Sequence, residues 1–132
     1  MKILFVCHGN VARSQMAEAF YNHFTESTDA WSAGTHQRAP ERYNPLPKVL
    51  FDIMEEMGVS MEGQYCKYVT QEMIDKSDKI YILCKEDLCP DFLLNSNKKE
   101  FWTVEDPYGM STDGIKKIRD LIKEKVLSII RT

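Results

Sequence analysis

A short apolar strand followed by a polar loop and a helix constrains the fold of this chain more than any other feature. Residues 3–6 are continuously apolar, which is typical of a strand covered on both faces of a parallel sheet. From Arg13 onward, apolar residues recur with helical spacing at Met16, Phe20 and Phe24. Because parallel strands need crossover connections, this start predicts an α/β domain.

The rest of the chain repeats the alternation of strand and helix. Further strands are predicted around Trp31, ending at 32–34, and at 79–83 and 101–104. Residues 34–47 are predicted to be a loop with three prolines. Helices are predicted over 49–57 with Gly58 as the end signal, from a Thr70 cap through Ile74, and from Ser111 or Thr112 onward. The apolar stripe of the last helix contains Ile115, Ile118, Leu121, Ile122, Val126, Ile129 and Ile130.

This order predicts a three-layer α/β fold in which helices flank a four-stranded parallel sheet, with a phosphate-binding loop after the first strand. The 132 residues suit a single domain, 1–132, with one sheet.

Composition and charge exclude several classes of function. The formal net charge is -3 and no Lys/Arg stripe is present, so no nucleic-acid partner is predicted. No run approaches the ~20 apolar residues of a membrane span, and the apolar run at the start is shorter than the roughly 7–15 residues of a signal-peptide core. We therefore expect a cytoplasmic monomer with no membrane partner, whose four cysteines are reduced thiols rather than disulfides.

The loop at residues 7–14 has the sequence Cys-His-Gly-Asn-Val-Ala-Arg-Ser and lies between the first strand and the first helix. In open parallel sheets, ligands bind beyond the carboxyl ends of the strands, where a helix N-terminus offers free N–H groups to an anion. The candidate nucleophile is Cys7, and Arg13 can hold a tetrahedral oxyanion through two parallel hydrogen bonds. The predicted substrate-binding residues are His8, Gly9, Asn10, Val11, Ala12, Arg13, Ser14 and Tyr108.

A proton donor is needed for the leaving group if Cys7 attacks a phosphate ester. Asp106 is the candidate, because it follows the fourth predicted strand and so shares the edge of the sheet with Cys7. Pro107 would stiffen its loop.

These residues resemble the low-molecular-weight protein tyrosine phosphatases and the thioredoxin-coupled arsenate reductases, which share one fold. Residues 7–14 resemble the signature loop, 32–34 the motif after the second strand, and 105–107 the acid loop. The resemblance covers nearly the whole chain. It implies Cys7 as nucleophile, Arg13 as clamp, Asn10 and Ser14 as supports of the loop, and Asp106 as acid.

The resemblance leaves two branches open. Gln15 resembles the reductases, since phosphatases usually have proline there, and Cys84 and Cys89 resemble the two further cysteines of the reductase thiol relay. In contrast, the short spacing between these two cysteines departs from reductases, and Tyr108 after Asp106-Pro107 resembles the phosphatase acid loop.

Some reductases bind potassium beneath the loop, and the resemblance places Asn10, Glu18 and Ser32 among its ligands. Lys67 stands where the ligand set has an aspartate, so we expect the Lys67 ammonium to replace the ion. Cys66 is predicted to be structural, and no metal or other cofactor is predicted. A zinc site on Cys84 and Cys89 lacks a second pair of ligands nearby.

The leading hypothesis for function is hydrolysis of phosphotyrosine or another aryl phosphomonoester, of a protein or a small molecule, with Tyr43, Tyr108 or Trp102 as candidate cleft residues. The second is arsenate reduction with a Cys7/Cys84/Cys89 relay and a thioredoxin partner. The loop alone does not separate them, because arsenate and phosphate are nearly the same anion. A non-catalytic oxyanion or redox sensor is the third reading, and it predicts a lost nucleophile, clamp or acid.

Overall fold

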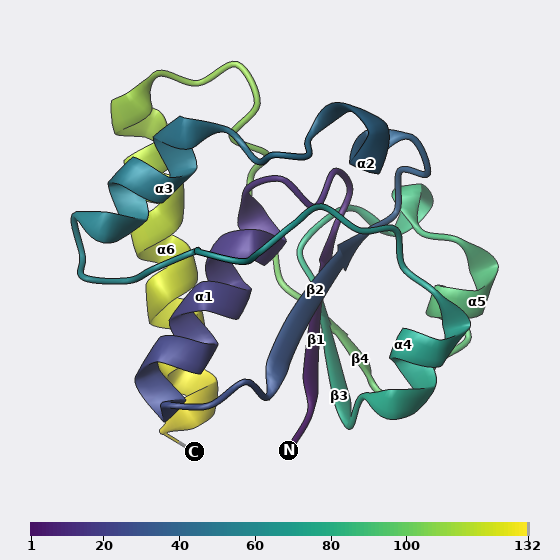
Figure 1. Ribbon diagram of the computed structural model, residues 1–132. Helices are drawn as coiled ribbons and strands as arrows, with labels where there is room; N and C mark the ends of the chain where they lie inside the picture. Colours follow the sequence, from purple (N-terminus) through teal and green to yellow (C-terminus); the bar gives the residue numbers. More distant parts are fainter. Residues whose placement is uncertain (132) are drawn as a thin grey trace.

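The structure is a computed structural model that describes residues 1–131, and its centre is one parallel sheet (Figure 1). The strands are β1 (Ile3–Cys7), β2 (Ala30–Gly34), β3 (Lys79–Ile82) and β4 (Lys99–Phe101). Their order is β2-β1-β3-β4, and all neighbours are parallel. Every residue of the central strand β1 is buried, as its continuous apolar run predicts.

Helices cover both faces of the sheet and complete the three predicted layers. One face carries α1 (Arg13–Thr25), α3 (Lys48–Glu55) and α6 (Thr112–Ile130), and the other carries α4 (Gln71–Lys76) and α5 (Asp91–Leu94). The short helices α2 (Ala39–Arg42) and η1 (Glu86–Leu88) lie in connections. Figure 1 shows α2 at the end of the sheet toward which the strands run. In the described part of the chain, no helix is both long and apolar enough to cross a membrane.

Two apolar clusters lie on the two faces of the sheet. The larger one joins the β1 side chains Ile3 and Phe5 to α1 and α6, and it includes Trp102, whose ring lies 4.5 Å from that of Tyr81. The smaller cluster joins Leu4 to α4 and α5. The strict alternation of β1 side chains between the clusters follows from the two-residue period of a strand.

Two predicted helix starts are confirmed by their caps. The Thr70 hydroxyl accepts from the Met73 N–H and begins α4, and the Ser111 hydroxyl accepts from the Gly114 N–H and begins α6. Gly58 adopts a φ of 74° just beyond α3, as expected of a glycine that ends a helix.

The structure differs from the prediction in several places. β4 spans Lys99–Phe101 rather than 101–104, because it is an edge strand, paired on one side only, in which polar residues are tolerated. The predicted loop 34–47 contains α2, in which Pro40 occupies the first turn, where proline is compatible with a helix. The sequence pattern did not predict α5, and Leu121, predicted in the α6 stripe, is 42% exposed.

The parallel register brings the ends of β1 and β2 to the same level, with Cys7 opposite Gly34. The nucleophile loop then crosses directly over Gly34. A Cβ atom at this position would lie 2.8 Å from the His8 carbonyl oxygen and 2.9 Å from the Asn10 Cβ. The loop can follow this path only because residue 34 has no side chain.

We therefore expect Gly34→Ala to lower the free energy of unfolding by about 1–3 kcal/mol, because backbone atoms that cannot yield meet the new methyl group. Urea denaturation checks this value. The control is Gly114→Ala, whose Cβ would lie 3.1 Å or more from Met110 side-chain atoms and has no backbone atom among its nearest neighbours. An unchanged stability of Gly34→Ala would contradict the close approach.

Candidate active site

Cys7 ends β1 and lies at the floor of the site. It is 2% exposed. Its Sγ accepts the Asn10 backbone N–H at 3.2 Å and lies 3.0 Å from the Ser14 Oγ. The first contact comes from the loop and the second from the first turn of α1, and both groups can donate hydrogen bonds that stabilise a thiolate.

Asn10 holds the nucleophile loop in its shape from within. Its φ is 53°, a left-handed conformation that asparagine tolerates better than most residues. The side-chain Nδ2 donates to Ser14 Oγ at 2.7 Å and to Ser32 Oγ at 3.0 Å. Asn10 and Ser14 are fully buried beneath the loop and do not line the cleft described below.

Arg13, the first residue of α1, is fixed from the sheet side. Its Nη1 donates to the Leu83 carbonyl at 2.7 Å and to the Val104 carbonyl at 3.1 Å. Its Nη2 lies 3.7 Å from Asp106 Oδ2. The predicted clamp and the predicted acid therefore face each other, although 93 positions separate them in the sequence.

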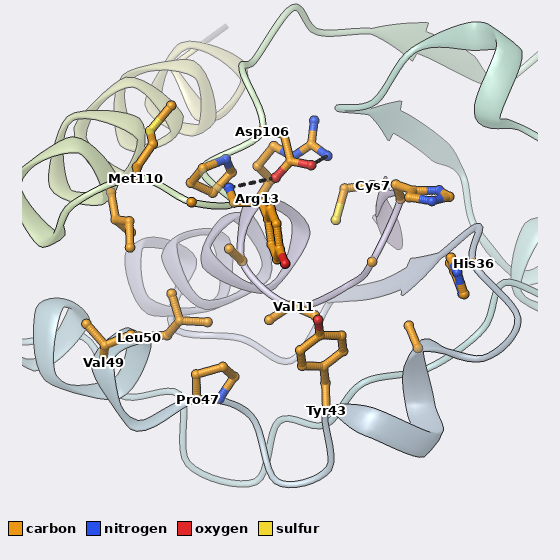
Figure 2. A pocket seen from close by; sticks show the side chains of 18 of the residues that line it. Cys7, Val11, Arg13, His36, Tyr43, Pro47, Val49, Leu50, Asp106 and Met110 are labelled. Carbon is orange, nitrogen blue, oxygen red and sulfur yellow. Dashed lines mark hydrogen bonds and ion pairs between the residues drawn. The ribbon is translucent and has the colours of Figure 1, made fainter.

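Asp106 lies on an exposed loop after β4, and its side chain is held by a backbone N–H two residues later. Its Oδ1 accepts the Tyr108 N–H at 3.0 Å, which is a local turn of the kind that aspartate favours. Figure 2 shows Asp106 and Arg13 meeting above the Cys7 sulfur.

A cleft of about 520 Å³ opens above the sulfur (Figure 2). This volume lies within the range of small-molecule sites. The predicted residues that line it are Cys7, His8, Gly9, Val11, Ala12, Arg13, Asp106 and Tyr108. Tyr43 also lines it, whereas Trp102 belongs to the core.

His8 stands at the mouth of the cleft. Its Nδ1 lies 3.0 Å from Thr35 Oγ1, and its ring meets that of His36 edge-on at 5.2 Å. Burial, with the nearby His36 and Arg13, lowers the pKa of His8, so its imidazole is neutral at pH 7.

Cys84 and Cys89 do not line this cleft. Their Sγ atoms are 3.9 Å apart, and Cys84 directly follows Leu83, which binds Arg13. The hydrogen bond between the two thiols and burial raise the pKa of Cys84, and the same hydrogen bond lowers the pKa of Cys89. Cys89 is therefore the first of the pair to ionise.

A segment at residues 64–67 supports the back of the nucleophile loop, and the sequence pattern did not predict this role for most of it. Gln15 Nε2 donates to the Tyr65 carbonyl at 2.8 Å and to both the Asn10 carbonyl and its Oδ1 at 3.0 Å. Gln64 donates in turn to the Gln15 Oε1 at 2.8 Å. The Cys66 thiol, whose pKa burial raises to about 11, donates to the Gly9 carbonyl.

The potassium ligands of some relatives are engaged differently in this chain. Asn10 Oδ1 accepts the Lys67 N–H at 2.8 Å as well as Gln15, and Glu18 Oε1 accepts from Ser32 at 2.7 Å. The Lys67 ammonium donates to the Tyr65 carbonyl, and its charge favours the ionised Glu18, whose pKa burial raises. Across residues 1–131, no three His, Cys, Asp or Glu side chains are grouped to hold a metal ion.

Comparison with known proteins adds an independent line of evidence. The model of the family described as low molecular weight phosphotyrosine protein phosphatase matches residues 2–132. The chain is 32% identical over 124 residues to an arsenate reductase of Staphylococcus xylosus, which covers 92% of this chain and 89% of that protein.

Two solved structures superpose on nearly the whole chain. An arsenate reductase in the phosphate binding state gives a TM-score of 0.82 at 28% identity and covers 99% of this chain and 98% of that one. A low molecular weight protein tyrosine phosphatase from T. tengcongensis gives 0.83 at 26% identity, with the same coverage.

We expect phosphate binding to be indifferent to potassium, because Lys67 supplies the charge next to Glu18. Titration of phosphate in potassium and in sodium buffers of equal ionic strength should give the same affinity. Lys67→Met should lower the free energy of unfolding by about 1–3 kcal/mol through loss of a charged hydrogen bond. Lys76→Met, which removes an exposed lysine paired with Glu72, is the control. If the wild type binds phosphate more tightly in potassium than in sodium, the hypothesis that the Lys67 ammonium replaces the potassium ion is wrong.

Proposed function

The chain belongs to the low molecular weight phosphotyrosine protein phosphatase family, and from this premise we propose that it hydrolyses aryl phosphomonoesters, phosphotyrosine above all, through a thiophosphate intermediate on Cys7. The observation that carries the proposal is the convergence of Cys7, Arg13 and Asp106 at one end of a cleft much larger than a bare oxyanion. Such a cleft suits an ester with an organic leaving group.

In the first step, the Cys7 thiolate attacks phosphorus in line with the ester oxygen. The S–P bond forms, the P–O bond breaks, and the Asp106 carboxylic acid gives its proton to the departing phenolate oxygen. Arg13 and the backbone N–H groups of the loop, other than the Asn10 N–H that binds the Cys7 sulfur, bind the three remaining phosphoryl oxygens and stabilise their charge in the transition state. The Leu83 and Val104 carbonyls occupy Arg13 Nη1, which orients the Nη2 edge toward the cleft.

In the second step, the Asp106 carboxylate takes a proton from water as the water oxygen attacks phosphorus. The S–P bond breaks, inorganic phosphate leaves, and Cys7 returns as a thiolate. The exposed position of Asp106 supports this role, because water reaches the carboxylate directly.

The leaving group is proposed to be a flat ring. Tyr43 and Tyr108 line the cleft together with Val11, a residue of the loop, so an aromatic ring finds apolar surfaces in the cleft that Cys7 also lines.

Arsenate reduction is the second candidate, supported by the 3.9 Å separation of Cys84 and Cys89 and by the similarity to the staphylococcal reductase. Cys7 would displace water from arsenate, and Cys84 would attack the Cys7 sulfur, which releases arsenite and forms a Cys7–Cys84 disulfide. Cys89 would then attack Cys84, free Cys7, and leave a disulfide that an external dithiol such as thioredoxin reduces. Neither Cys84 nor Cys89 lines the cleft above Cys7, which counts against this candidate.

Side-by-side assays of p-nitrophenyl phosphate hydrolysis and single-turnover arsenate reduction test both candidates. As a phosphatase, the protein should lose all detectable turnover with Cys7→Ser and about 10²–10⁴-fold in kcat with Asp106→Asn, through loss of the general acid. Cys84→Ser and Cys89→Ser should hydrolyse the ester like the wild type. One equivalent of arsenite that requires all three cysteines, without ester hydrolysis, would overturn the phosphatase proposal in favour of the reductase.

A further inference from the structure

The cleft has two chemically different ends. Cys7, Arg13 and Asp106 form one, and the other, which we name the apolar end, consists of Pro47, Val49, Leu50, Met110 and Ile115. Figure 2 shows Met110, Val49 and Leu50 on one side of the cleft and Cys7 on the other. None of the five side chains of the apolar end carries a charge, so its chemistry differs from that of the oxyanion loop.

The apolar end is built on fixed elements. Pro47 and Val49 belong to the start of α3, where Leu50 is buried, and Ile115 lies in the first turn of α6. Val49, Met110 and Ile115 are half-buried and pack against the larger core cluster. A surface whose side chains are held by the core is preorganised, so a ligand does not pay the entropy of ordering it.

The proposed reaction leaves this end of the cleft unused. A phosphoryl group on Cys7 with its ring beside Tyr43 occupies the charged end and the middle of the 520 Å³. These half-buried apolar side chains remain in contact with water. An apolar group that covers them lowers the free energy, because it removes apolar surface from water.

Tyr108 at the rim of the cleft offers exposed surface to a ligand that extends out of the cleft. Tyr108 is 87% exposed and lies two residues after Asp106. A small aryl phosphate bound at Cys7 would leave most of the Tyr108 ring in water. A polypeptide that carries the phosphorylated ring runs along the rim and can cover this tyrosine while a neighbouring side chain enters the cleft.

We propose that the apolar end is a specificity subsite for an aliphatic or aromatic side chain that neighbours phosphotyrosine in a protein substrate. This inference rests on the proposed function and names its substrate class. The apolar side chain is bound in the ground state and in the transition state alike, so the subsite acts on kcat/KM and on affinity.

The test uses phosphotyrosine peptides that differ at one neighbour of the phosphotyrosine, Leu or Ser, with the neighbour placed on either side. The wild type should hydrolyse the better Leu peptide with a kcat/KM about tenfold above its Ser partner, since burial of a leucine side chain in an open cleft realises part of its full transfer free energy. Calorimetric affinities of the same peptides for Cys7→Ser should show the same ratio without turnover.

Three variants assign the preference to the subsite. Met110→Gln keeps the volume and adds a polar amide, and it should reduce the Leu/Ser ratio to about threefold or less. Met110→Leu should retain the ratio. Met57→Gln is the matched control, because Met57 is also a half-buried methionine packed on the same core but does not line the cleft.

Each outcome has one meaning. If the Leu and Ser peptides have the same kcat/KM and the same affinity, the subsite proposal is wrong. A tenfold gain of 4-butylphenyl phosphate over phenyl phosphate, with no difference between the peptides, would also overturn it, because the occupant would then be a small molecule. A preference in the Cys7→Ser affinities without any turnover by the wild type would support the subsite and refute phosphatase activity.

Discussion

The hydrogen bonds of the Asn10 side chain are the interaction on which the site depends. Its amide nitrogen binds the Ser14 and Ser32 hydroxyls, and its oxygen accepts from Gln15 and from the Lys67 backbone. These bonds hold a left-handed residue in a buried loop, where any unpaired amide group would be costly. They keep the Asn10 N–H directed at the Cys7 sulfur, so the nucleophile is positioned by a network that no substrate touches.

Buried elements could be predicted from the sequence better than exposed ones. β1 has an unbroken apolar run because both faces are covered, and α6 has a stripe and a serine cap. β4 was predicted two residues too late, because an edge strand contains charged residues such as Glu100 and its apolar neighbour Trp102 packs beyond the strand. The four-residue helices α2 and α5 are too short to produce a helical period.

The reacting side chains could be predicted because Cys7 and Arg13 lie in one short loop and Asp106 follows a strand that ends at the same edge. The sequence predicted that these side chains lie close together, but not the distances or contacts between them. The residues that support the loop could not be predicted in this way. Gln15 donates to the backbone carbonyl of Tyr65, 50 positions away, and every residue type has such a carbonyl. The apolar end of the cleft likewise unites α3 with the start of α6, a pairing that depends on tertiary structure alone.

The amide pair of Gln15 and Gln64 makes the two positions unequal under substitution. Loss of Gln15 would strip the Asn10 and Tyr65 carbonyls of a buried donor. Loss of Gln64 exposes less, because this side chain is half-buried and water can replace its amide. Position 15 is therefore expected to tolerate fewer residue types than position 64, although the two side chains form one amide pair.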